Sequence, residues 1–206
     1  MTRRNVLGGS LGIALASLIR AFPPDRWDRK SPKDWTKQDR EWILEASPWV
    51  VTAAIRRAPS GAAWNQRDIP RTSFTGPLNI RWESARPVAT VLDSDSRLVE
   101  NFVINLRGHE ILAASGFLSD RTAAATALEL QGAVSLRFDH LIVRPSQVGR
   151  ILRGKRQGLA FYFPRNDLTQ PTVPPEEIVF RANIRDLEIT AQFDPSAMLY
   201  QGHLAL

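Results

Sequence analysis

The sequence contains no cysteine among its 206 residues. No disulfide and no thiolate-based zinc site can therefore form. Lipid attachment to a mature N-terminal cysteine, the bacterial lipoprotein mode, is excluded as well. The composition, 43% hydrophobic and 23% charged, is that of a globular domain, so we expect a hydrophobic core to hold the chain together.

Long hydrophobic runs are also missing, because the longest one, residues 6–19, is shorter than the roughly 20 residues that a membrane-spanning helix needs. Arg3 and Arg4 precede this run and Arg20 follows it. A short basic segment followed by a moderately apolar stretch is typical of an export signal. The order Thr2-Arg3-Arg4-x-apolar-Leu7 resembles the twin-arginine consensus, and the glycines within the run favour that route over general secretion.

Residues 1–22 are therefore predicted to be an export signal of the twin-arginine type, with Arg3 and Arg4 as its recognition residues. The export machinery is then a partner, and the location is periplasmic or secreted. We expect no stable membrane span after signal cleavage, although the cleavage position and retention as an anchor stay open. An amphipathic or buried N-terminal helix is the alternative.

The chain also lacks a strong charge of one sign outside this segment. Lys and Arg number 27 against 21 Asp and Glu; residues 1–22 hold three arginines and no acid, so 24 basic side chains remain against 21. Both signs are interspersed, which argues against a nucleic-acid partner. The densest basic cluster, around Arg150 and residues 153–156, is expected to be a solvated loop, with contact to an anionic surface as the alternative.

Clusters of proline and polar residues divide the rest of the chain into segments. Residues 23–33 are predicted to be a linker, residues 34–57 a helical segment, and residues 58–77 a loop. Thr36 and Asp39 have capping-box spacing, and Ser47-Pro48 should end the helix near Ala46. Whether the helical segment packs into the main core stays open.

From residue 78 onward the apolar residues alternate with polar ones. The alternation is clearest over residues 178–184, 187–193 and 200–206, and a strand is also predicted over 136–143. Period-2 patterning predicts antiparallel strands with one buried and one wet face. We therefore predict a mainly β fold, an antiparallel β-sandwich (immunoglobulin-like or similar) over residues 78–206. Residues 119–130 fit either a helix or a strand.

Three histidines are the candidates for chemistry: His109, His140 and His203. None has metal-motif spacing, so they would have to converge in space to bind a metal. Asp139 and His140 should point to opposite faces of the strand over 136–143, which prevents a direct dyad. Unrelated surface histidines are the favoured interpretation.

Other patterns have an ordinary explanation. Residues 93–96 resemble the start of a calcium loop, but Leu98 and Ile104 occupy the positions where an EF-hand needs glycine and glutamate, so an Asx-rich turn is favoured. The tryptophans are expected to pack on a core, with ligand stacking as the alternative. A G-x-S-x-G match at residues 8–12 lies in the export segment and is a chance match.

The elements Trp35-Thr36-x-x-Asp39 and Ser47-Pro48-Trp49 resemble those of a group of uncharacterised exported bacterial proteins. The segments 161–165 and 198–206 are similar in that group too. The resemblance implies export and a shared fold, and it assigns no activity to any residue.

These observations favour a non-catalytic, envelope-associated binding or structural module, with an envelope protein or polymer as partner. The alternative is an exported hydrolase-type or metal-dependent enzyme with a site around His109 or His140. The sequence predicts no catalytic, metal-binding or cofactor-binding residue.

Overall fold

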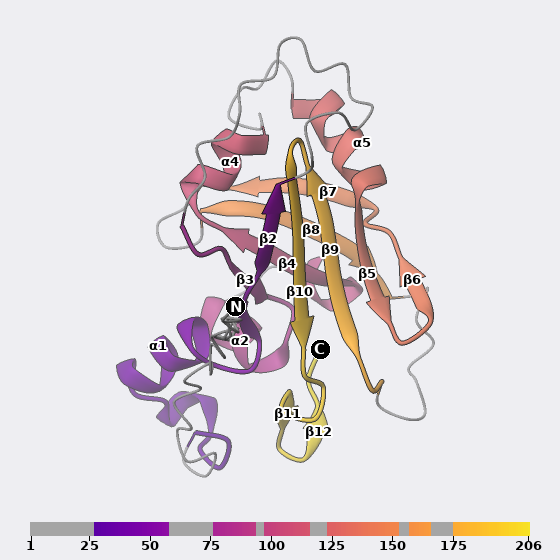
Figure 1. Ribbon diagram of the computed structural model, residues 1–206. Helices are drawn as coiled ribbons and strands as arrows, with labels where there is room; N and C mark the ends of the chain where they lie inside the picture. The colour runs from indigo at the N-terminus through magenta and orange to yellow at the C-terminus, as the bar shows by residue number, and fades with distance from the viewer. Residues whose placement is uncertain (1–26, 58–75, 94–96, 116–122, 153–156, 166–174) are drawn as a thin grey trace, which may run out of the picture.

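The computed structural model describes residues 27–57, 76–93, 97–115, 123–152, 157–165 and 175–206. Figure 1 shows a body of β-strands with short helices around it. The helices are η1 Pro32–Asp34 (a 3-10 turn), α1 Lys37–Glu45, α2 Arg86–Leu92, α3 Arg97–Glu100, α4 His109–Ser115 and α5 Ala123–Ala133. The strands are β1 Val50–Thr52, β2 Ala54–Arg57, β3 Asn79–Trp82, β4 Asn101–Arg107, β5 Val134–Phe138, β6 Leu141–Val143, β7 Gln147–Ile151, β8 Gly158–Pro164, β9 Ile178–Ile184, β10 Leu187–Phe193, β11 Leu199–Tyr200 and β12 His203–Leu204.

The strands form two five-stranded antiparallel sheets. Sheet A has the order β1-β3-β4-β8-β7, and sheet B has the order β2-β10-β9-β5-β6; β11 and β12 make a separate hairpin. The pairs in both sheets are antiparallel, as the predicted alternation requires. The prediction of a mainly β, antiparallel sandwich is confirmed.

The two sheets are linked at both of their margins. On one side the chain passes from β1 at the edge of sheet A to β2 at the edge of sheet B through a single residue, Ala53. On the other side residues 144–146 connect β6 of sheet B to β7 of sheet A. The chain therefore crosses from one sheet to the other at both margins of the sandwich.

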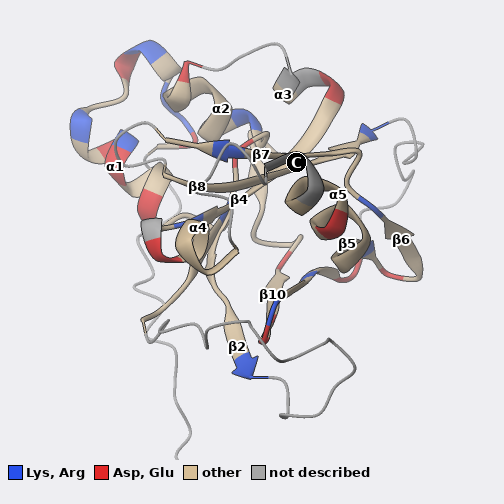
Figure 2. Ribbon diagram, turned by 90° about the horizontal axis from the view of Figure 1, so that it is seen from above, with Lys and Arg blue, Asp and Glu red and all other residues tan. Residues whose placement is uncertain are grey.

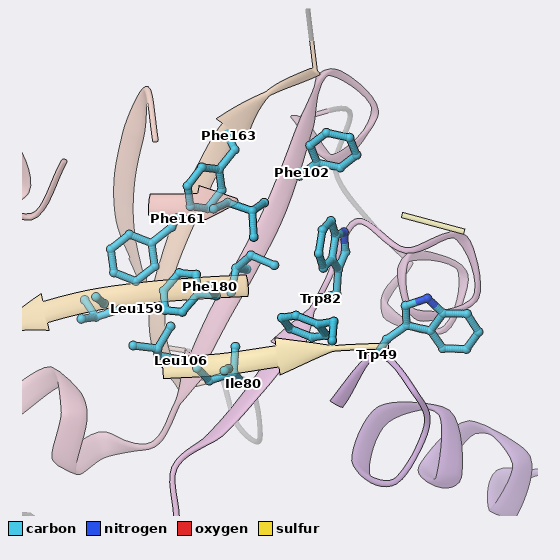
Figure 3. Close-up of a cluster of buried hydrophobic side chains, with 14 of the residues drawn as sticks. Trp49, Ile80, Trp82, Phe102, Leu106, Leu159, Phe161, Phe163 and Phe180 are labelled. Atoms are coloured by element: carbon cyan, nitrogen blue, oxygen red, sulfur yellow. The ribbon is translucent and has the colours of Figure 1, made fainter. Parts of the chain in front are cut away.

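Aromatic side chains fill the space between the sheets. Figure 3 shows Trp82 and Phe102 on one flank of this core, and Phe161, Phe163 and Phe180 on the other. The ring centroids of Trp82 and Phe193 lie 5.2 Å apart in an edge-to-face contact, and those of Phe161 and Phe180 lie 5.7 Å apart. Edge-to-face pairs stabilise a core beyond the effect of the area they bury, so the geometry of the ring contacts adds to the stability of this core.

The helices cover sheet A and one end of the sandwich. Figure 2 shows α1, α2 and α3 on the side of sheet A that faces away from sheet B, with α4 and α5 over the end of the strands. In Figure 1 sheet B stands in front of sheet A, and the described helices lie behind it or at its ends. The two sheets therefore have outer faces of different character.

The start and end of α1 follow the sequence signals. The Thr36 hydroxyl accepts a hydrogen bond from the Asp39 backbone N–H, and the Asp39 carboxylate accepts one from the Thr36 N–H, which completes the predicted capping box. Lys30 forms an ion pair with the same carboxylate at 2.7 Å. The helix ends at Ala46 as predicted, ahead of Ser47-Pro48.

The predicted segment boundaries around this helix are wrong. Helix α1 occupies only residues 37–45 of the segment 34–57, because residues 50–52 and 54–57 pair as strands with β3 and β10. The sandwich thus takes in residues upstream of the predicted start at 78. Within the predicted linker 23–33, Trp27 is only 6% exposed and belongs to the core. The apolar residues 49–55 form strands rather than helix because strands far along the chain, β3 and β10, pair with them.

The strand predicted over residues 136–143 is a hairpin instead. Asp139 adopts φ +49°, and Phe138 pairs directly with Leu141, so Asp139 and His140 form a two-residue turn between β5 and β6. Asp tolerates this left-handed conformation better than most residues, which allows the turn without glycine. The ambiguous residues 119–130 contribute to helix α5 from Ala123 onward.

Candidate functional site

The histidines lie on three different elements. His140 is exposed in the β5–β6 turn, and His203 is exposed at the start of the β11–β12 return strand. His109 begins α4, and its side chain is outside the described part of the structure. In Figure 1, α4 and β12 lie toward opposite ends of the molecule. Over the described ranges, the structure contains no group of three or more His, Asp or Glu side chains able to hold a metal ion.

Asp139 serves the turn rather than a dyad with His140. Its Oδ1 accepts hydrogen bonds from the backbone N–H groups of Glu176 and Glu177, both at 2.9 Å. The Arg137 guanidinium forms an ion pair with the Glu177 carboxylate alongside. The Asp139 carboxylate therefore ties the β5–β6 turn to the chain that enters β9.

The tryptophans of the N-terminal segment pack against one another and against the C-terminal hairpin. Trp27 stacks on Tyr200, and its ring centroid lies 5.5 Å from those of Trp42 and Trp49. Trp49 donates its indole N–H to the backbone oxygen of Ala205 at 2.6 Å. Trp27, Trp35 and Trp49 are buried, so these three rings form core structure and the ligand-stacking alternative is wrong for them, whereas Trp42 is half-buried. Trp64 lies outside the described residues.

The outer face of sheet A holds a buried charged cluster that the sequence did not predict. Arg81 of β3 is 1% exposed, and Glu83, which follows β3, is fully buried. The Arg81 Nη2 lies 2.6 Å from Glu83 Oε1, and Asn105 of β4 donates its side-chain N–H to the same oxygen at 2.8 Å. Arg81 and Asn105 are direct cross-strand partners, so the register of β3 and β4 places the cluster.

The same arginine reaches the end of α1. The Leu44 carbonyl near the C-terminus of the helix accepts hydrogen bonds from Arg81 Nη1 at 3.3 Å and from Arg107 Nη1 at 3.4 Å. Arg107 also binds the Glu45 carboxylate through both terminal nitrogens, at 2.6 and 2.9 Å. Guanidinium groups at a helix C-terminus satisfy its free carbonyls and oppose its negative dipole. The cluster therefore fastens α1 to sheet A.

Burial controls the electrostatics of the cluster. Removal from water lowers the pKa of the Arg81 guanidinium below its ordinary value. The Glu83 carboxylate opposes this shift but does not cancel it. A buried charge persists only when it is paired and hydrogen-bonded, as Arg81 is. Arg81, Glu83 and Asn105 are enclosed by protein, so these groups contact one another and α1 rather than solvent.

A sequence signal for this cluster does exist. Arg81 and Glu83 stand two residues apart, so on an extended chain they share a face and carry opposite charges. The alternation assigned that face to water, but α1 and α2 cover it. The helix α2 itself, residues 86–92, was not predicted.

The outer face of sheet B is open by contrast. Strand register brings its side chains into rows across β2, β10, β9 and β5. One row runs Arg56–Glu188–Asn183, and the next runs Ala54–Thr190–Arg181–Ser135. All of these residues are exposed except Ser135, which is half-buried. We call this surface the open face of sheet B.

Other predicted features lie partly outside the described residues. Arg150 is half-buried in β7, whereas residues 153–156 of the basic cluster are not described. Asp93 caps the C-terminus of α2 in the left-handed conformation, and residues 94–96 are not described. The export signal with Arg3 and Arg4, the G-x-S-x-G match and most of the loop 58–77 are likewise outside the description.

Within the ranges that the structure covers, the longest apolar helix falls short of what a membrane crossing requires. The comparison with known proteins found no matching family model, no matching curated protein and no matching solved structure.

Proposed function

We propose that the protein is an exported, non-catalytic module of the bacterial cell envelope that binds an acidic envelope partner through the open face of sheet B. Export rests on the twin-arginine pattern at Arg3 and Arg4, ahead of the apolar run 6–19. Binding rests on the exposure and charge of one sheet face, and the two parts of the proposal are tested separately.

The observation that carries the binding proposal is the difference between the two sheets. On the outer face of sheet A, Arg81, Glu83 and Asn105 are buried and bonded to one another. Sheet B presents polar side chains of four neighbouring strands to solvent in regular rows. Side chains that a sheet holds in regular rows are preorganised for contact with an extended surface, which limits the entropy lost on binding.

The charges of this face favour an acidic partner. Arg56 stands opposite Glu188, and Arg137 is paired with Glu177. Arg181 instead stands between Thr190 and Ser135, which carry hydroxyl groups and no charge. The centre of the face therefore carries an arginine whose cross-strand neighbours do not neutralise it, and we expect the attraction to weaken as salt screens it.

Export is tested by replacing Arg3 and Arg4 with lysine in the full-length chain and following its location by cell fractionation. We expect the variant to remain in the cytoplasm. Arg56→Lys with Arg57→Lys changes a second adjacent arginine pair in the same way and should be exported like the wild type. Undiminished export of the Arg3/Arg4 variant would refute the twin-arginine assignment.

Binding is tested by cosedimentation of the exported protein with purified envelope fragments at low and high salt. Arg181→Glu reverses the central charge of an exposed residue and should reduce the bound fraction at low salt, whereas Glu188→Gln should not. Envelopes stripped by protease then separate a polymer from a protein partner. Equal binding by Arg181→Glu and wild type, or no binding by either, would overturn the proposal.

The alternative of an enzyme site around His109 or His140 stays a prediction. His140 is a solvent-exposed turn residue beside a carboxylate that is engaged with backbone N–H groups. The open face of sheet B thus supports the binding proposal, whereas the surroundings of His140 offer no comparable support for an enzyme site.

A further inference from the structure

Strand β6 is an unusual edge. It is the last strand of sheet B, and its three residues, Leu141, Ile142 and Val143, are all apolar. Ile142 is 58% exposed and Leu141 is 41% exposed. Edge strands of soluble proteins are commonly protected by short length, charges, prolines or bulges. β6 is short and is followed by Arg144 and Pro145, but residues 141–143 themselves contain neither a charge nor a proline.

The β5–β6 hairpin decides which backbone groups face outward. Phe138 and Leu141 flank the two-residue turn and so form the hydrogen-bonded pair of an antiparallel hairpin. The next pair, Arg137 and Ile142, is then the non-bonded one. Consequently the backbone N–H and C=O of Ile142 point away from β5, toward the free edge, and its side chain lies on the open face of sheet B.

We infer that β6 pairs antiparallel with β6 of a second copy of this chain, with the two-fold axis between the two Ile142 residues. In that register Ile142 of each copy donates its N–H to, and accepts from, Ile142 of the other. Leu141 of one copy stands opposite Val143 of the other. The strand is its own complement, as an isologous two-fold contact requires.

This pairing covers both exposed apolar side chains of the edge with one contact. The two Ile142 side chains meet on the same face, and the Leu141 side chains gain apolar neighbours on the inner face. Arg144, just beyond the strand, is held back by hydrogen bonds from its Nη1 to the carbonyls of Gly132 and Val134, at 2.8 and 3.1 Å. These hydrogen bonds hold the Arg144 guanidinium against its own chain.

The dimer is expected to be weak. A strand of three residues buries less than the roughly 1,200 Å² at the lower limit of standard stable interfaces. The association is therefore reversible and depends on concentration. It joins the two B sheets into one continuous sheet and doubles the open polar face, a consequence that does not depend on what this face binds.

Sedimentation velocity of the full-length protein, from micromolar to millimolar concentration, tests the inference. We expect a shift from monomer to dimer for the wild type, and at least a tenfold weaker association, about 1.4 kcal/mol, for Ile142→Lys. Leu128→Lys is the matched control, because Leu128 is 73% exposed but belongs to α5 and not to the edge strand. It should dimerise like the wild type.

A fold check and a second variant keep the outcomes distinct. Both lysine variants change exposed side chains, so their thermal unfolding midpoints should match the wild type. Ile142→Pro removes the outward N–H and should also abolish dimerisation, since proline is tolerated on the free edge of a sheet. A wild type that stays monomeric, an Ile142→Lys protein that dimerises normally, or equal weakening by Leu128→Lys would overturn the inference. The wild type and all three variants carry the same N-terminal apolar run, so the comparison isolates the edge.

Discussion

Trp27 stacks face to face on Tyr200, with ring centroids 5.6 Å apart and an angle of 6° between the planes. Trp27 is the first described residue, and Tyr200 closes β11 near the other end of the chain. Asp28 accepts a hydrogen bond from the Gln201 backbone N–H at 2.6 Å, which reinforces the contact. The segment next to the predicted export signal is therefore an integral part of the fold.

Trp27→Ala should destabilise the protein by about 3–5 kcal/mol, the usual cost of removing a buried large aromatic side chain. The expected readout is a lower midpoint of urea unfolding for the full-length chain. Tyr200→Phe, which keeps the stacked ring, should cost much less. Equal midpoints for Trp27→Ala and wild type would show that the stack contributes little.

Alkaline pH should weaken this contact through Tyr200. Burial, reinforced by Asp28 and opposed by the Arg86 guanidinium, raises the pKa of Tyr200 above its ordinary 10.0. The folded state then holds the phenolic proton more tightly than the unfolded state. The stabilisation is fully present below pH 10 and is lost as pH rises through the raised pKa. Unfolding midpoints measured across the alkaline range should fall more steeply for the wild type than for Tyr200→Phe; parallel curves would contradict this.

The buried Arg81–Glu83 pair should show strong coupling in a double-mutant cycle. Glu83→Gln leaves the Arg81 guanidinium buried without its counter-charge and should cost about 3–5 kcal/mol. Adding Arg81→Met removes that stranded charge, so the double variant should lose clearly less than the sum of the two single variants. Denaturant unfolding of the four proteins measures the coupling, and additive losses would argue against a paired charge.

Gly158 should tolerate no side chain. A Cβ at this position would lie 2.0 Å from the Leu106 carbonyl oxygen and 2.5 Å from Asn105 Oδ1, so Gly158→Ala forces β4 and β8 apart. We expect severe destabilisation or failure to fold. In Gly132→Ala, the control, the new Cβ meets nothing within 4 Å and lies in α5, so this change should stabilise the helix by about 0.5–1 kcal/mol. Comparable stability of the two variants would contradict the close approach of the strands.

Much of the fold could be predicted because its signals are local. The capping box of Thr36 and Asp39 and the alternation over 178–184 and 187–193 depend only on neighbours along the chain, and the structure contains each of them. The turn at Asp139 was missed because its left-handed residue is not glycine. The sequence wrongly predicts residues 50–57 to be helical, because a short apolar run has no clear period of its own.

The candidate sites also divide into features with a local sequence signal and features set by contacts between distant segments. Sequence spacing already indicated that the histidines form no motif, and the described turns leave His140 and His203 exposed on separate elements. The Arg81, Glu83 and Asn105 cluster could not be predicted, because its members are joined by the register of two strands and buried by helices from elsewhere in the chain.

The sequence by itself determined the absence of disulfides, the mainly β pattern and which residues of each strand share a face, since these follow from residue type and a period of two. Only the tertiary structure decided which of those faces water reaches. It covered the Arg81 face of sheet A with helices and left the Arg181 face of sheet B open, although both read as alternating polar positions. The reason is that burial depends on what packs against a strand, and that partner is set by contacts between segments far apart in the chain.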